Sequence, residues 1–157
     1  MRVTPPQPVA VRPATPDDVA WLASCALAMA WETEQRRLDH ATVAAGIAAG
    51  VADPAKARYF IASTADGRRA GTLMLTTEWS DWRNGAWWWI QSVHVDPGHR
   101  RAGIYTALHR RVEALARAKS GVVGLRLYVE RGNAGAMQTY ARAGMVDAGY
   151  ALWEIAF

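Results

Sequence analysis

The residues best suited to chemistry lie in the stretch HVDPGHRRAGIYTALHRRVEALARA, residues 94–118, where a β-like run passes through a turn into an amphipathic helix. The turn places Arg100, Arg101 and Gly103 directly before the predicted helix. The first N–H groups of a helix have no partners within it and lie at the positive end of its dipole, so they attract phosphate. A glycine lets a phosphate approach the backbone, and arginines add charge-assisted donors. We predict a phosphate-binding turn; the alternative is an ordinary helix start with solvated arginines.

A second segment, LYVERGNAGAMQTYARAGM, follows this turn and makes the pattern more specific. The pair of segments resembles the GNAT superfamily of N-acetyltransferases. The family's turn, Arg/Gln-x-x-Gly-x-Gly/Ala, appears here as residues 100–105, with Tyr105 in place of the final Gly or Ala. The family's later pattern, Asn-x-x-Ala-x-x-x-Tyr-x-x-x-Gly-Phe, keeps its spacing in Asn133, Ala136, Tyr140, Gly144 and Met145.

The resemblance implies an enzyme that transfers the acetyl group of acetyl-CoA, its cosubstrate, to a primary amine of a small molecule or an exposed protein amine. It also implies that Tyr140 donates a proton to the departing CoA thiolate. A non-catalytic acyl-CoA-binding or sensor module of the same fold is the alternative. The cofactor-binding residues implied are Val93, His94, Val95, Arg100, Arg101, Ala102, Gly103, Ile104, Tyr105, Asn133, Ala136 and Tyr140.

An acceptor amine must lose a proton before it attacks, so a general base or a water chain is needed. For each carboxylate that could serve, a solvated surface position is the competing interpretation. The possible bases are Glu32, Glu34, Glu78, Asp81 and His94, and Glu78 and Glu34 join Tyr140 as predicted catalytic residues. The tryptophans are predicted to divide between the core and an acceptor pocket for an aromatic or cationic amine. The predicted acceptor-binding residues are Trp31, Glu32, Trp79, Asp81 and Trp82.

The elements that must position these residues follow from periodicity and from start and stop signals. A strand at 9–12 precedes a helix capped by Thr15, and a second helix runs from Asp39 to the stop at Asp53 and Pro54. An Asp-Gly turn joins strands at 58–64 and 69–79. Further predicted elements are a central strand at 86–95, a helix whose buried stripe includes Ile104 and Leu108 and whose polar face includes His109, a strand at 121–130, a helix at 134–143, and one or two strands at 145–157.

A strand, a long crossover helix and another strand imply a parallel βαβ unit beside an antiparallel meander. The predicted fold is therefore a mixed α/β single domain, GNAT-like, with a central, mostly antiparallel mixed sheet and flanking helices. It is expected to span residues 9–157 behind a flexible leader, 1–8, which has neither the h-region of a signal peptide nor a membrane anchor.

Composition limits the remaining classes. The chain has 157 residues, 51% of them hydrophobic and 20% charged, which is typical of a soluble globular domain. Its one cysteine, Cys25, predicts neither disulfides nor a metal site, and we expect a cytoplasmic, bacterial protein without a membrane partner. The net charge of +4 suits nucleic acid, an acidic surface or a phosphate-bearing ligand, and charge alone does not choose among them. No basic run or RNP-type motif favours a nucleic-acid partner. An exposed C-terminal strand would make a homodimer possible.

Overall fold

The computed structural model describes residues 8–157, so the predicted leader lies outside the described residues except for its last position. The chain divides into two compact units, residues up to Arg126 and Leu127–Phe157, which are taken separately below. No helix of residues 8–157 is both long and apolar enough to cross a membrane.

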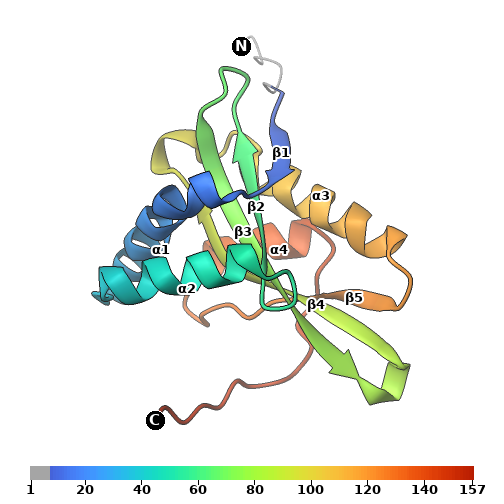
Figure 1. Ribbon diagram of the computed structural model, residues 1–157. Helices are drawn as coiled ribbons and strands as arrows, with labels where there is room; N and C mark the ends of the chain where they lie inside the picture. Colours follow the sequence, from blue (N-terminus) through green and yellow to red (C-terminus); the bar gives the residue numbers. More distant parts are fainter. Residues whose placement is uncertain (1–7) are drawn as a thin grey trace. The chain divides into compact units, whose positions relative to one another are not determined.

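The first unit holds one five-stranded sheet with the strand order β1-β2-β3-β4-β5. Strands β1 to β4 are antiparallel neighbours, while β5 runs parallel to β4 after the crossover helix α3. This is the predicted meander with a βαβ unit (Figure 1). The elements are β1 (Ala10–Pro13), η1 (Pro16–Asp18), α1 (Val19–Glu34), α2 (His40–Ala52), β2 (Arg58–Ser63), β3 (Arg69–Ser80), η2 (Asp81–Arg83), β4 (Gly85–Val95), η3 (Pro97–His99), α3 (Ile104–Ala118) and β5 (Val122–Arg126).

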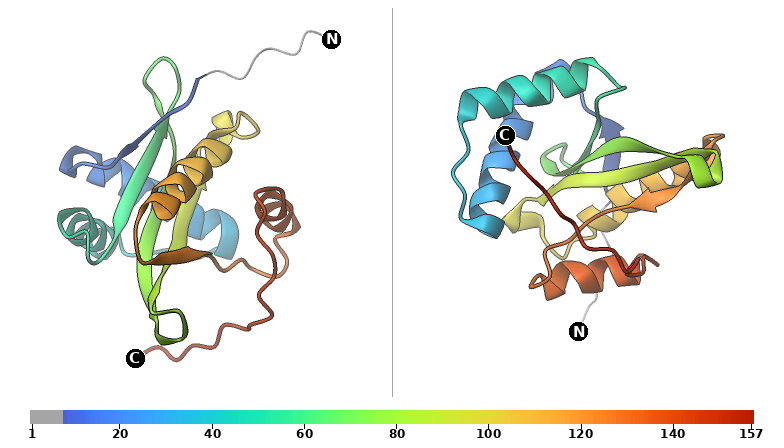
Figure 2. Two further views of the ribbon diagram at one scale, coloured as in Figure 1. Left: turned by 90° about the vertical axis from the view of Figure 1, so that its right-hand side faces the viewer. Right: turned by 90° about the horizontal axis from the view of Figure 1, so that it is seen from below.

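Helices cover both faces of this sheet. Helices α1 and α2 pack on one face, where Leu22 and Ile47 join Ile61 of β2 in a buried cluster. Helix α3 packs on the other face, so closely that a Cβ added to Gly71 of β3 would lie 2.5 Å from the Ile104 side chain. Figure 2 shows the sheet between these two layers. Gly71 therefore lets the start of α3, and the turn before it, approach the sheet.

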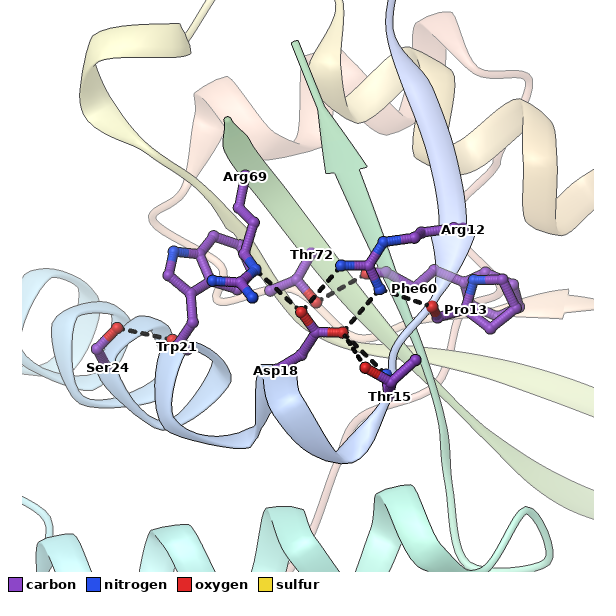
Figure 3. Close-up of polar contacts among 9 residues, drawn as sticks. All are labelled: Arg12, Pro13, Thr15, Asp18, Trp21, Ser24, Phe60, Arg69 and Thr72. Carbon is purple, nitrogen blue, oxygen red and sulfur yellow. Dashed lines mark hydrogen bonds and ion pairs between the residues drawn. The ribbon is translucent and has the colours of Figure 1, made fainter. Parts of the chain in front are cut away.

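A buried carboxylate fastens the start of α1 to the sheet (Figure 3). Asp18 is fully buried and accepts two hydrogen bonds from the Arg12 guanidinium, at 2.7 and 2.9 Å. It also accepts from Arg69 Nε at 2.9 Å and from the amide of Thr15 at 2.8 Å. The hydrogen bonds from Arg12 hold the pKa of Asp18 far below its usual range, against the opposing effect of burial. The predicted helix start at Thr15 is thus completed by β1 and β3.

The second unit contains one helix, α4 (Ala134–Arg142), among its described elements. Asn133 Oδ1 accepts a hydrogen bond from the amide of Ala136 at 3.0 Å, as the predicted N-cap requires. Gly144 follows the helix with φ of +86°, the left-handed conformation expected at this position.

Three predictions at the element level were wrong. No strand forms at 145–157, because no neighbouring strand completes a ladder with it, and its large apolar side chains are exposed. The strand predicted at 121–130 ends at Arg126, where its ladder with β4 also ends, opposite Trp89. His109 is buried rather than on the polar face of α3, since it directly follows Leu108 on a broad buried side of the helix.

Candidate functional site

The turn between β4 and α3 has a conformation suited to an anion. Arg101 and Gly103 both have left-handed backbone, with φ of +62° and +80°. No backbone hydrogen bond in residues 8–157 uses the amide of Ala102 or Gly103. No atom lies within 4 Å of the place where a Cβ on Gly103 would be, so the space over this backbone is open. These amides stand at the positive end of the α3 dipole, where a phosphate is favoured.

The turn itself is held by its own side chains. Asp96 Oδ1 accepts a hydrogen bond from the amide of Gly98 at 2.8 Å, which closes the short helix η3. The amide of Asp96 donates to the carbonyl of Ala70 at 2.9 Å and ties the end of β4 to β3. The local sequence therefore forms a hydrogen-bonded bend directly before the amides of Ala102 and Gly103.

The two arginines of the turn make different contacts. Arg100 donates to both carboxylate oxygens of Glu32, at 2.6 and 2.7 Å, and its Nε donates to the carbonyl of Val95 at 3.2 Å. The hydrogen bond from Arg100 lowers the pKa of Glu32, so this carboxylate stays charged near neutral pH. Arg101 is exposed, and no ion pair of the described chain includes it. The end of α1, at Glu32, is thereby joined to the turn.

Strand β4 is interrupted by a β-bulge just before this turn. Thr72 pairs with His94, yet Met74 pairs with Gln91, so β4 has one extra residue here. Ser92 lies at the bulge with φ of +49°, which is uncommon for a residue other than glycine. The parallel ladder with β5 ends at Trp89, so in this sheet residues 90–95 of β4 have no partner strand on the β5 side. Backbone groups on the other side of this segment could pair with an extended ligand.

A cavity of about 70 Å³ lies beside the bulge, between α1, α2 and the sheet. Its polar wall is formed by Ser92, His94 and Thr72, and Cys25 and Tyr59 also line it. Burial lowers the pKa of His94, and the nearby charge of Arg100 lowers it further, so the imidazole is neutral at pH 7. A neutral imidazole can accept a proton.

The predicted acceptor residues do not all lie in one place. Trp31, Glu32 and Glu34 belong to the end of α1, near the turn. Glu78 pairs with Trp87 across the β3–β4 ladder, eight residues from the end of β4 at Val95. At a strand rise of about 3.3 Å per residue, this corresponds to roughly 26 Å from the turn. Trp79, Asp81 and Trp82 lie still closer to the hairpin tip, at the opposite end of β4 from the turn (Figure 1).

The side chains around Glu78 are already paired with one another. Glu78 accepts a hydrogen bond from Trp89 Nε1 and a weaker one from Arg126 at 3.3 Å. The guanidinium of Arg126 stacks on the Trp87 ring, 4.1 Å from its centroid. Likewise, Arg37 lies 5.2 Å from the ring centroid of Trp31. Arginines of the chain therefore occupy the cation–π positions at both Trp87 and Trp31.

Tyr105, the departure from the family pattern, has its hydroxyl 3.1 Å from His109 Nδ1, one turn further along α3. Neither this pair nor the bulge at Ser92 was recognised in the sequence. The spacing of four residues between Tyr105 and His109 could have indicated the pair. In the second unit, Asn133 caps α4, and burial raises the pKa of Tyr140 above its usual value.

Comparisons with known proteins agree with this geometry. The family model described as "Acetyltransferase (GNAT) family" matches residues 17–145. This chain belongs to the GNAT acetyltransferase family. Among solved structures, a possible acetyltransferase from Clostridium difficile 630 is 35% identical, with a TM-score of 0.87 over 95% of this chain and 97% of that one. A GCN5-related N-acetyltransferase from Ralstonia eutropha JMP134 is 24% identical, with a TM-score of 0.72 over 94% and 99% of the two chains, and shares the fold. No curated protein sequence matches the chain.

The GNAT match extends beyond the first unit. It includes the β4–α3 turn and all of α4, and it ends at Met145. The match to the possible acetyltransferase from Clostridium difficile 630 covers 95% of this chain. The mixed five-stranded sheet with its parallel βαβ unit is therefore the fold of the family, as the sequence predicted.

Proposed function

We propose that this GNAT protein transfers the acetyl group of acetyl-CoA to a primary amine, either of a small molecule or of a protein surface. The observation that carries the proposal is the β4–α3 turn at the positive end of α3: the amides of Ala102 and Gly103 take part in no backbone hydrogen bond of residues 8–157, and the space at the Cβ position of Gly103 is open. The diphosphate of acetyl-CoA has the charge and the small size that such a turn binds. Arg101 supplies the nearby positive charge.

The segment of β4 beyond the bulge is proposed to bind the extended arm of acetyl-CoA. Within the sheet, residues 90–95 have no partner strand on the β5 side, so Val93 and Val95 can offer backbone groups to an extended chain. A backbone N–H of this strand can also polarise the acetyl carbonyl. Acetyl-CoA supplies a thioester, whose acyl group is activated toward amines.

Two proton transfers accompany the reaction. The amine nitrogen forms a bond to the acetyl carbon while the carbon–sulfur bond breaks, so the amine loses a proton and the thiolate gains one. His94 is the base that the geometry supports best, because it is neutral at pH 7 and lines the cavity at the bulge. Glu78 is supported less well, since it lies far along β4 and already contacts Arg126. Tyr140 is proposed as the acid by the family resemblance, and its raised pKa keeps the phenol protonated.

A thiol-release assay with acetyl-CoA and a panel of small amines and peptides tests the activity. We expect amine-dependent release of free CoA. Binding of acetyl-CoA without release for any acceptor would favour the non-catalytic acyl-CoA-binding module instead.

The binding turn is tested by Gly103→Glu. A carboxylate at this position would repel the phosphates, so we expect the Kd of acetyl-CoA to rise about 10- to 100-fold, which equals about 1.4–2.8 kcal/mol. The matched control is Gly67→Glu, because Gly67 has the same left-handed backbone, with φ of +83°, and equally open surroundings in the β2–β3 turn. Equal Kd values for the two variants would place the phosphates elsewhere.

The proposed acid is tested by Tyr140→Phe, which keeps the ring and removes the hydroxyl. General acid catalysis typically contributes about 10²- to 10⁴-fold. We therefore expect kcat to fall by that order while the Kd of acetyl-CoA is unchanged, with Tyr150→Phe as the control. An unchanged kcat under conditions where chemistry limits turnover would remove Tyr140 from the mechanism.

A further inference from the structure

A hollow of about 520 Å³ lies between β1, the turn that joins β2 to β3, and the beginning of α1. Its volume is within the range of small-molecule sites, about 300–1,000 Å³. No residue of β4 or of the β4–α3 turn lines it, so it is separate from the proposed acetyl-CoA site. We refer to it as the arginine hollow. Its lining residues all belong to the first unit: Arg12, Trp21, Ser63, Gly67, Arg68 and Arg69.

The ion pairs of the arginine hollow contain more positive than negative charge. Arg12 and Arg69 share one buried carboxylate, that of Asp18, at distances of 2.7 and 2.9 Å. Arg68 pairs with Asp66 at 3.1 Å. Three guanidinium groups are thus set against two carboxylates. Within this group of ion pairs, one positive charge therefore remains uncompensated.

The carboxylate of Asp18 has no room for the remaining arginine N–H groups. Its oxygens already accept from both terminal nitrogens of Arg12, from Arg69 Nε, and from the amide and hydroxyl of Thr15 (Figure 3). A carboxylate offers about four acceptor positions, so this one is saturated. No hydrogen bond of the described chain uses the terminal nitrogens of Arg68 or Arg69. An anion that enters the arginine hollow can bind these donors.

Two contacts hold the Arg69 side chain in place. Its Nε donates to Asp18 at 2.9 Å, and its guanidinium lies 5.9 Å from the ring centroid of Trp21 (Figure 3). Because the side chain is already ordered, binding a ligand costs little further conformational entropy there. The Trp21 ring packs against the core cluster of α1 and α2 and also lines the arginine hollow, where it forms an apolar wall. The site therefore combines ordered cationic donors with an aromatic surface.

We infer that the arginine hollow binds a small organic molecule that carries a carboxylate beside an aromatic or apolar group. A carboxylate matches the planar pair of donors that a guanidinium presents, and its single charge matches the one uncompensated positive charge. The apolar part of the molecule packs against Trp21. This ligand differs in chemistry from acetyl-CoA, whose phosphates we propose to lie at the β4–α3 turn.

Titration with benzoate in the absence of acetyl-CoA tests the site, with binding followed by NMR through the assigned indole N–H signal of Trp21. We expect a saturable shift with benzoate. Benzamide has the same ring but no charge, and acetate has the charge but no ring to bury, so each should bind at least about tenfold more weakly. No saturable shift with benzoate would overturn the inference, and so would inorganic phosphate that binds as tightly as benzoate.

Two variants at exposed positions should change the affinity for benzoate in opposite directions. Arg68→Gln removes a cationic donor group and should raise the Kd about tenfold, the loss of one charge-assisted hydrogen bond. Asp66→Asn removes the carboxylate that competes for Arg68, so it should lower the Kd several-fold. The two side chains are 76% and 58% exposed, so both variants should keep the fold. Equal Kd values for the parent and both variants would contradict the assignment of the site.

Acetyl-CoA separates this inference from the proposed function. Gly103→Glu should raise the Kd of acetyl-CoA and leave that of benzoate unchanged, and Arg68→Gln should do the reverse. A parent that binds benzoate but not acetyl-CoA would refute the proposed function alone, and a parent that binds only acetyl-CoA would refute the inference alone. If acetyl-CoA displaced benzoate and Arg68→Gln weakened both, the arginine hollow would belong to the acetyl-CoA site and a separate site would be rejected.

Discussion

At the scale of single residues, the two arginines of the β4–α3 turn have separate tasks. Arg100 is held by both oxygens of Glu32 and by the carbonyl of Val95, so it connects α1 to the turn. A phosphate could recruit Arg100 only by displacing a charged carboxylate. Arg101 is exposed and has left-handed backbone within the turn itself. Arg101 is therefore the residue that we expect to contact the phosphates.

Arg101→Gln should raise the Kd of acetyl-CoA about tenfold, which equals about 1.4 kcal/mol and lies near the lower end for a charge-assisted hydrogen bond. It should also weaken the dependence of binding on salt, because one charge pair is lost. Isothermal titration at two salt concentrations measures both effects. Arg68→Gln is the control, since Arg68 is an exposed turn arginine that pairs with Asp66.

Arg100→Gln and Glu32→Gln should behave as a pair in thermal unfolding. Each breaks the same ion pair, so each should lower the melting temperature by a similar small amount, and the double variant should be little worse than either single one. If Arg100→Gln raised the Kd much more than Arg101→Gln, then Arg100 would be the phosphate ligand and the division of tasks would be wrong.

At the scale of elements, β4 shows what the sequence could and could not predict. The strand itself followed from its apolar run, and the caps at Asp39 and Asn133 were predictable because each is a hydrogen bond between near neighbours. The bulge was not predictable, since a run that is apolar on both faces carries no mark of register, and Ser92 is not a glycine. The segment 145–157 has residues typical of a strand, but a strand also needs a partner strand, and that partner cannot be predicted from the segment itself.

The position of the start of α1 depends on the ion pairs that Asp18 makes with Arg12 of β1 and Arg69 of β3. Asp18→Asn would leave Arg12 and Arg69 without their shared carboxylate, and we expect the free energy of unfolding to fall by about 2–3 kcal/mol. This is less than the roughly 3–5 kcal/mol for breaking a fully buried pair, because both arginines are partly exposed. Urea denaturation at pH 7 measures the loss. Asp17→Asn is the control, since Asp17 is an exposed neighbour.

The same carboxylate predicts how stability depends on pH. The pKa of Asp18 is lowered in the folded protein, so its contribution is complete above the unfolded value of about 3.9 and is lost as the pH falls below it. The difference in stability between the parent and Asp18→Asn should therefore shrink as the pH is lowered below about 4. If this difference in stability stayed constant from pH 7 to pH 3, the negative charge of Asp18 would contribute nothing to the free energy of unfolding.

At the scale of the whole molecule, the excess of positive charge and the proposed phosphate-binding turn favour the same class of ligand. The chain carries a net charge of +4, and acetyl-CoA carries its negative charge on phosphates. A ligand that binds only the folded protein stabilises it by mass action. Because we propose that the turn binds the phosphates and that β4 binds the pantetheine arm, the two parts of acetyl-CoA should make separable contributions.

Acetyl-CoA at a hundredfold excess over its Kd should stabilise the protein by about 2.7 kcal/mol. For a chain of this size, that corresponds to a rise of about 5–10 °C in the melting temperature. Acetyl-pantetheine has the same thioester and arm but no diphosphate, so at the same concentration it should give a much smaller rise. High salt should reduce the shift with acetyl-CoA and leave that with acetyl-pantetheine unchanged, since only charged contacts are screened. Equal shifts for the two ligands would show that the arm alone drives binding and that the turn does not hold the phosphates.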